Sequence, residues 1–134
     1  MPKKHYEMTF CTALKKWLDH EFPYNCFIEA KISVDDKPFN LRSGFKEHQL
    51  PCLISARQGV FSYKISDMDR MQKPFDIIHT HKIKTYVAIM WIRKGNKTFY
   101  LINPIAIQGM IDDSKKSITE EDAVLLSDFM GILK

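Results

Sequence analysis

A glutamate and a lysine lie two residues apart inside an otherwise apolar segment, Phe27-Ile28-Glu29-Ala30-Lys31-Ile32. If the segment is a β-strand, Glu29 and Lys31 point to one side and their apolar neighbours to the other, because side chains alternate along a strand. A buried charge without a partner is costly, so a strand of this kind has a reason for its charges. A carboxylate beside an ammonium group can hold a divalent metal ion and a water near a phosphodiester. A structural ion pair has the same pattern, and the tripeptide alone does not distinguish the two.

Three further segments contain residue types that suit the same chemistry. They are His48-Gln49, Tyr63-Lys64-Ile65-Ser66-Asp67 and Lys73-Pro74-Phe75-Asp76. Together with Glu29-Ala30-Lys31, these segments resemble the PD-(D/E)XK nuclease superfamily, and most closely its Holliday-junction-resolvase-like branch, which is found in phages and in recombination proteins. The resemblance covers about residues 27–104, and its specificity comes from the combination, because each piece is short and common.

The resemblance implies a role for each residue of this set. Glu29 and Asp76 would be the metal ligands, and Lys31 would be the catalytic lysine. Gln49 would contact the water, the metal shell or the DNA backbone. The implied cofactor is Mg²⁺, with Mn²⁺ as the alternative ion. The superfamily often adds a carboxylate from the first helix, but no sequence context selects between the two candidates here, Glu7 and Glu21.

The order of the motifs departs from the family pattern. In the family the aspartate strand precedes the E-x-K strand, whereas Asp76 follows Lys31 in this chain. A permuted arrangement therefore requires that the strand of residues 75–79 lie in the sheet next to the Glu29 strand. If it lies elsewhere, the two-carboxylate site fails, and Asp67 is then the substitute for Asp76. Asp67 and Asp69 are otherwise interpreted as loop carboxylates.

The chemistry of phosphodiester hydrolysis supports this set of residue types. The reaction requires that negative charge be neutralised on a pentavalent transition state. It also requires that a water molecule be activated as the nucleophile. A Mg²⁺ ion held by two carboxylates meets both needs. An adjacent lysine can orient the water or stabilise charge on the phosphate.

Hydrophobic periodicity and turn residues predict the elements that must position these side chains. An amphipathic helix is expected over residues 6–20, and a second helix within residues 44–58, beginning near Leu50 so that Pro51 falls in its first turn. A capping box formed by Ser117 and Glu120 predicts a last helix that continues through Phe129. The strands are expected at residues 27–32, 60–65, 75–79, 85–92 and 98–102. This pattern predicts an α/β or α+β fold, a mixed central sheet flanked by helices, for which the resemblance implies a restriction-endonuclease-like core.

Composition sets the broader limits. The 134 residues, 45% of them hydrophobic, fit a single domain over residues 1–134. No apolar run approaches the roughly 20 residues of a membrane span, and no secretory signal is evident, so an intracellular, cytoplasmic location is expected, in the host cytoplasm if a phage encodes the chain. The net charge of +4 suits a phosphate-rich partner. The three cysteines are expected to be reduced and mostly buried.

Other candidate residues have an ordinary interpretation beside the functional one. His79 and His81 would face one side of a strand, where they either ligate a transition metal or form an ordinary hairpin surface. Lys64 is either a solvent-facing residue or a phosphate contact. Trp17 and Trp91 lie in apolar patterns, which predicts core positions before base-stacking ones.

We therefore expect a metal-dependent, structure-selective DNA endonuclease of the Holliday-junction-resolvase type. The expected partner is branched or junction DNA, with no membrane association. The resemblance implies a homodimer, because two symmetric cuts need two sites. The alternative is a non-catalytic member of the same fold that binds nucleic acid or a protein. A third possibility is a protein-interaction domain in which the E-x-K tripeptide is accidental.

Overall fold

A four-stranded mixed sheet forms the centre of the computed structural model, which describes residues 3–67, 73–93 and 96–133. Its strands lie in the order β1-β5-β6-β8. Strands β1 and β5 are parallel, whereas β5 with β6 and β6 with β8 are antiparallel. The four strands are β1 (Cys26–Val34), β5 (Lys84–Arg93), β6 (Asn96–Ile102) and β8 (Ser127–Ile132).

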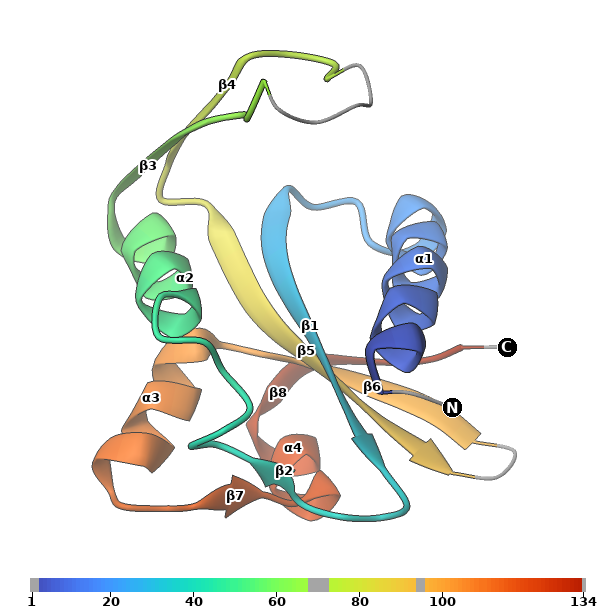
Figure 1. Cartoon of the computed structure of the whole chain (residues 1–134). Coiled ribbons are helices and arrows are strands. Elements are labelled where there is room, and N and C mark those ends of the chain that lie inside the picture. The colour runs from blue at the N-terminus through green and yellow to red at the C-terminus, as the bar shows by residue number, and fades with distance from the viewer. Residues whose placement is uncertain (1–2, 68–72, 94–95, 134) are drawn as a thin grey trace.

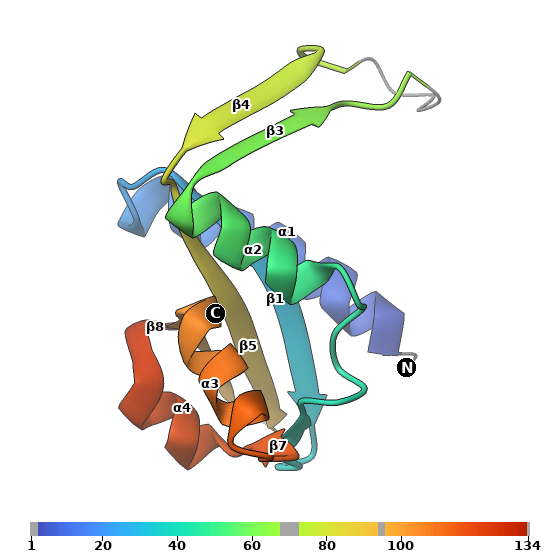
Figure 2. The same ribbon diagram turned by 90° about the vertical axis from the view of Figure 1, so that its left-hand side faces the viewer.

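Helices flank this sheet, which confirms the predicted fold class (Figure 1). Helix α1 (Lys3–Glu21) packs on one face, and α2 (Gln49–Gln58) and α3 (Pro104–Asp112) on the other, with α4 (Glu120–Leu126) beside them. Two short antiparallel pairs complete the described part: β2 (Phe39–Asn40) with β7 (Ser117–Ile118), and β3 (Val60–Lys64) with β4 (Ile77–His81). The β3–β4 hairpin projects beyond the sheet (Figures 1 and 2).

Apolar side chains fill both faces of the sheet, and β5 shows the alternation most clearly. Its even-numbered residues pack toward α1, and its odd-numbered residues pack toward α2 and α3. None of these side chains is more than 4% exposed: Tyr86, Ala88 and Met90 on the first face, Val87, Ile89 and Trp91 on the second. A strand buried on both sides reads as a continuous apolar run, which is how β5 appears in the sequence.

The two tryptophans are core residues, as predicted. Trp91 is 2% exposed, and Trp17 packs against the cluster on the α1 face, with its ring edge-on to Phe99 at 4.9 Å between centroids. The expectation of mostly buried cysteines is wrong, because Cys11 and Cys52 are exposed and only Cys26 is half-buried. Among the described residues, no helix has the length and apolar character needed to cross a membrane.

The end of the chain differs most from the prediction. The helix expected through Phe129 ends at Leu126, and residues 127–132 form β8 instead. Phe129 and Gly131 point inward while Met130 and Ile132 are exposed, which is the period of a strand. A Cβ at Gly131 would lie 2.4 Å from the Phe99 ring, so only glycine allows β8 to pack this closely.

Helix α3 has no counterpart in the sequence-based prediction. Asn103 caps it by accepting a hydrogen bond from the backbone N–H of Ile105 at 2.9 Å, and Pro104 occupies its first turn. Both are ordinary start signals, but the apolar helix that follows has the same composition as a buried strand.

The capping box lies two residues after the predicted one. The hydroxyl of Thr119 accepts from the backbone N–H of Asp122 at 3.1 Å, and the Asp122 carboxylate accepts from the N–H of Thr119 at 3.0 Å. Ser117, the expected cap, is in β7. The hydrogen bond from the Thr119 N–H lowers the pKa of Asp122. The contribution of the Asp122 carboxylate to the stability of the fold is therefore fully present above the ordinary Asp pKa. It is lost as the pH falls through the lowered pKa of Asp122.

Replacing Thr119 by alanine is expected to lower the free energy of unfolding by about 1 kcal/mol, because the N–H of Asp122 loses its partner. Urea denaturation at neutral pH measures the change. Ser117→Ala is the control and is expected to cost less than about 0.5 kcal/mol. A larger loss for Ser117→Ala than for Thr119→Ala would contradict the assignment of the cap.

Candidate active site

Strand β1 presents Glu29 and Lys31 on the same face of the sheet. Ile28, Ala30 and Ile32 pack against the cluster on the α1 side. Glu29 and Lys31 therefore face the α2 side, as the alternation predicts. Their Oε1 and Nζ atoms are 3.4 Å apart.

Helix α2 brings Gln49 to these two residues. The Nε2 of Gln49 donates to Oε1 of Glu29 at 2.9 Å, and its Oε1 accepts from Nζ of Lys31 at 2.9 Å. Pro51 falls in the first turn of α2, where a missing N–H has no cost, so the helix begins where the prediction places it. Three of the four predicted site residues thus form one hydrogen-bonded group.

The amide of Gln49 is held in one orientation. Its oxygen accepts a second hydrogen bond, from the backbone N–H of Lys46 at 2.9 Å. Both groups that face this oxygen are donors only, whereas Glu29 is an acceptor, so the reverse orientation would set donor against donor. Gln49 therefore fixes the positions of the carboxylate and the ammonium relative to each other.

Burial differs between the two charged side chains. The side chain of Lys31 is 10% exposed, whereas that of Glu29 is 32% exposed. The Lys31 Nζ lies 5.4 Å from the centre of the Phe45 ring, which contributes a cation–π contact. The carboxylate is thus open to a ligand, with a desolvated ammonium group beside it. Charge interactions are stronger in such a partly dehydrated setting.

Asp76 is not brought to this group by the predicted strand arrangement. In the described part of the chain, β4 pairs with β3, and the sheet neighbour of β1 is β5. Asp76 precedes β4 on the hairpin, where its carboxylate is 77% exposed and lies 3.0 Å from Nζ of Lys73. The permuted arrangement required the Asp76 strand to lie in the sheet next to the Glu29 strand, and this condition is not met, because β4 pairs with β3 in a separate two-stranded sheet.

Asp67 also belongs to the hairpin. It forms ion pairs with Lys64, at 3.4 Å, and with Lys73. The Lys64 side chain is 73% exposed, in agreement with the solvent-facing interpretation. Asp69 lies outside the described residues.

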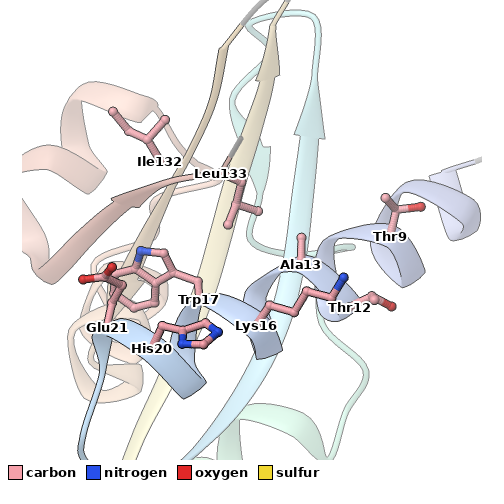
Figure 3. Close-up of a pocket in the computed structure, with 9 residues that line it drawn as sticks. All are labelled: Thr9, Thr12, Ala13, Lys16, Trp17, His20, Glu21, Ile132 and Leu133. Carbon is pink, nitrogen blue, oxygen red and sulfur yellow. The ribbon is translucent and has the colours of Figure 1, made fainter.

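The two candidate carboxylates of α1, Glu7 and Glu21, lie near opposite ends of the helix. Burial raises the pKa of the Cys11 thiol, and the charges of Glu29 and then Glu7 raise it further. Glu7 lies one helical turn before Cys11. Glu21 instead lines a separate cavity of about 630 Å³ between α1 and the end of β8, together with Trp17 and Ile132 (Figure 3). Helix α1 packs on the face of the sheet opposite α2, so its position selects neither first-helix candidate as a partner of Glu29.

His79 and His81 share one face of β4, as the sequence predicts. Their ring centres are 5.2 Å apart. Within the described ranges, however, no three His, Cys, Asp or Glu side chains form a group that can hold a metal ion. Both histidines are exposed on the hairpin, which agrees with the hairpin-surface interpretation.

Aromatic side chains that were not among the predicted site residues also contribute to this region. Phe45 covers Lys31 from the loop before α2. Phe61 and Tyr63 of β3 line a cavity next to Glu29 and Gln49. Alternation of Phe61 and Tyr63 along a strand was the one available signal, because it places both rings on the same face.

Comparison of the chain with protein-family models, with curated proteins and with solved structures found no match.

Proposed function

We propose that this protein is a metal-dependent endonuclease that hydrolyses phosphodiester bonds in branched DNA, and that Glu29, Lys31 and Gln49 form its active site. The observation that supports the proposal is the hydrogen bonding of Gln49 to both Glu29 and Lys31, because these residues come from separate elements. If the E-x-K tripeptide were accidental, there would be no physical reason for its two charged side chains to bind Gln49, the glutamine that the resemblance implies.

Each residue has a role that follows from its position. Glu29, the more exposed of the charged pair, would hold a divalent cation and a water. Lys31 would place its positive charge on the phosphate where negative charge develops, with little reorganisation because its side chain is already fixed. Gln49 is a positioning residue, since it restrains both side chains.

The residues present fit a hard divalent cation. Mg²⁺ in proteins is commonly bound through one or two carboxylates, several waters and the substrate phosphate. Glu29 supplies one carboxylate, and waters and the substrate phosphate would supply the other ligands. When bound, such an ion supplies charge neutralisation and a more acidic water.

A homodimer is the proposed assembly. The two strands cut in a four-way junction are related by two-fold symmetry, and each chain offers one such site. Light scattering of the purified protein measures the oligomeric state.

A second candidate function is favoured by a specific observation. The described part of the chain contains no three-residue metal-binding group, and Asp76 does not reach the Glu29 sheet through its strand. A non-catalytic member that binds branched nucleic acid would have these features.

Cleavage and binding of four-way junctions decide between the two candidates. The nuclease is expected to nick the junction in Mg²⁺ or Mn²⁺ and, in Ca²⁺, to bind it more tightly than linear duplex of equal length. Both affinities are expected to fall with salt, because phosphate contacts release counterions, while their ratio persists. Binding without cleavage on branched, flapped and single-stranded substrates favours the non-catalytic candidate. Equal affinity for junction and duplex at every salt concentration contradicts structure selectivity.

A further inference from the structure

A cavity of about 380 Å³ lies between the β3–β4 hairpin and α2, directly next to Glu29 and Gln49. Its volume is at the lower end of the range for small-ligand sites, so it suits a single ring system rather than a helix or a folded segment. Besides the two site residues, its wall contains mainly apolar and aromatic side chains: Phe27, Cys52, Leu53, Ala56, Phe61, Tyr63 and Ile78, with His48 at the α2 end.

The hairpin presents two different faces, and one of them forms the cavity. The register pairs Tyr63 with Ile78, and both line the cavity. The alternate residues, such as Val60 and Ile77, point to the other face, where they are 52% and 62% exposed. The figures show the hairpin extending from the end of α2 as an arm (Figure 2).

The aromatic rings in the wall are arranged for stacking. Phe61 meets Phe27 of β1 edge-on, with ring centres 5.4 Å apart, and this contact anchors the hairpin to the central sheet. The rings of Phe61 and Tyr63 are nearly parallel, at an interplanar angle of 8° and 6.2 Å between centres. Tyr63 is 55% exposed, so much of its side chain is accessible to a ligand.

Continuity with the active site limits the identity of the occupant. Glu29 and Gln49 border the cavity, and Gln49 joins it to the ammonium group of Lys31. A ligand here would place a flat apolar group against Tyr63 while an attached anion lies near Lys31. A nucleotide within a DNA strand has this form, with a base and its phosphate joined through one sugar.

We propose that this cavity holds one unstacked base of the DNA strand next to the phosphodiester at Glu29, with Tyr63 as its stacking platform. The proposal rests on the proposed function, because the position of the base follows from the position of the phosphate. Branched DNA that contains unpaired or single-stranded bases would supply such a base at low cost, because unstacking costs least for a base that is already unpaired. The cavity would therefore contribute to structure selectivity.

Binding of single-stranded oligonucleotides with and without bases tests the proposal. The probe is an oligothymidylate, and its comparison strand has the same phosphates with abasic sugars. In Ca²⁺, Tyr63→Ala is expected to weaken binding of the oligothymidylate about tenfold, the usual loss for a base stacked on an aromatic ring, and to leave binding of the abasic strand unchanged. Val60→Ala is the matched control, because Val60 is equally exposed on the opposite face of the same strand. It is expected to change neither affinity.

A chemical footprint gives a second readout. Cys52 lines the cavity and is exposed. The oligothymidylate is expected to slow its alkylation by iodoacetamide, whereas the abasic strand at equal occupancy is expected to do so much less. Mass spectrometry of the digested protein separates Cys52 from Cys11 and Cys26.

The outcomes separate this proposal from the nuclease proposal. Equal losses for both strands in Tyr63→Ala, or equal protection of Cys52 by both, overturn the base site even if the wild type cleaves DNA. A base-dependent loss with no cleavage of any substrate supports the base site and overturns the nuclease. Failure of the wild type to bind either strand overturns the base site.

Discussion

Replacing Glu29 by glutamine is expected to reduce the cleavage rate of four-way junctions in Mg²⁺ by about a thousandfold or more. Glutamine keeps the shape of the side chain and an oxygen that can accept from Nε2 of Gln49, but it removes the charge that attracts the cation. A bound metal contributes several kcal/mol to the stabilisation of the transition state, and about 4 kcal/mol corresponds to a thousandfold. Single-turnover cleavage with saturating protein measures the change.

The fold is expected to survive this substitution. Lys31 loses an ionic partner at 3.4 Å but keeps its hydrogen bond to Gln49, so the free energy of unfolding should fall by only about 1 kcal/mol. Urea denaturation and circular dichroism establish this.

Asp76→Asn is the comparison variant, because it removes a carboxylate from the hairpin. The structure places Asp76 beside Lys73, so this change is expected to alter the cleavage rate less than threefold. An Asp76→Asn variant as inactive as Glu29→Gln would show that the hairpin aspartate reaches the metal. Full activity in Glu29→Gln would exclude the proposed site.

The part of the site that sequence predicted correctly depends on local rules. Alternation along a strand puts Glu29 and Lys31 on one face whatever else the chain does. Pro51 is compatible with the first turn of a helix, and this places Gln49 at the start of α2. The contact between the two elements came only from the family resemblance, because no local rule states which strand a helix packs against.

The placement of Asp76 failed for a physical reason that short motifs do not contain. Phe75 and Asp76 precede a real strand, but pairing partners depend on connections and on competing edges. Strand β4 pairs with β3 in the hairpin, and β5 pairs with β1 along its whole length. A carboxylate can therefore belong to the right kind of segment and still lie outside the sheet that contains the site.

The error at the end of the chain has a related cause. Ala123, Leu126 and Phe129 have helical spacing, while Phe129 and Gly131 have strand spacing, so the two periods overlap at Phe129. Residues 127–132 form a strand rather than a helix because they pair with the edge of β6, and because Gly131 allows close contact with Phe99. The secondary structure of this segment therefore depends on tertiary packing, which overrides the local preference for a helix.

Replacing Lys31 by methionine is expected to lower the cleavage rate by about a hundredfold to a thousandfold at saturating DNA, the usual loss when one charge-stabilising donor is removed from an active site. Methionine has a similar length and an adaptable shape, so it can fill the space of a side chain that is only 10% exposed without leaving a cavity. Gln49 keeps its hydrogen bond from the Lys46 backbone, and the Glu29 carboxylate remains. Binding of Mn²⁺, measured by titration calorimetry, is therefore expected to persist while cutting is lost.

Lys46→Met is the matched control for the loss of one positive charge near the site. The Lys46 side chain is exposed, and the hydrogen bonds between Lys46 and Gln49 are made by the backbone N–H and C=O of Lys46. This variant is expected to weaken DNA binding across all sequences and to reduce the salt slope by about one, with little change in the cleavage rate once DNA is saturating. A Lys31→Met variant with the same behaviour would assign Lys31 to phosphate binding alone. Loss of Mn²⁺ binding in Lys31→Met would instead mean that Lys31 acts by holding the Glu29 carboxylate in place, because an ammonium group cannot itself ligate the cation.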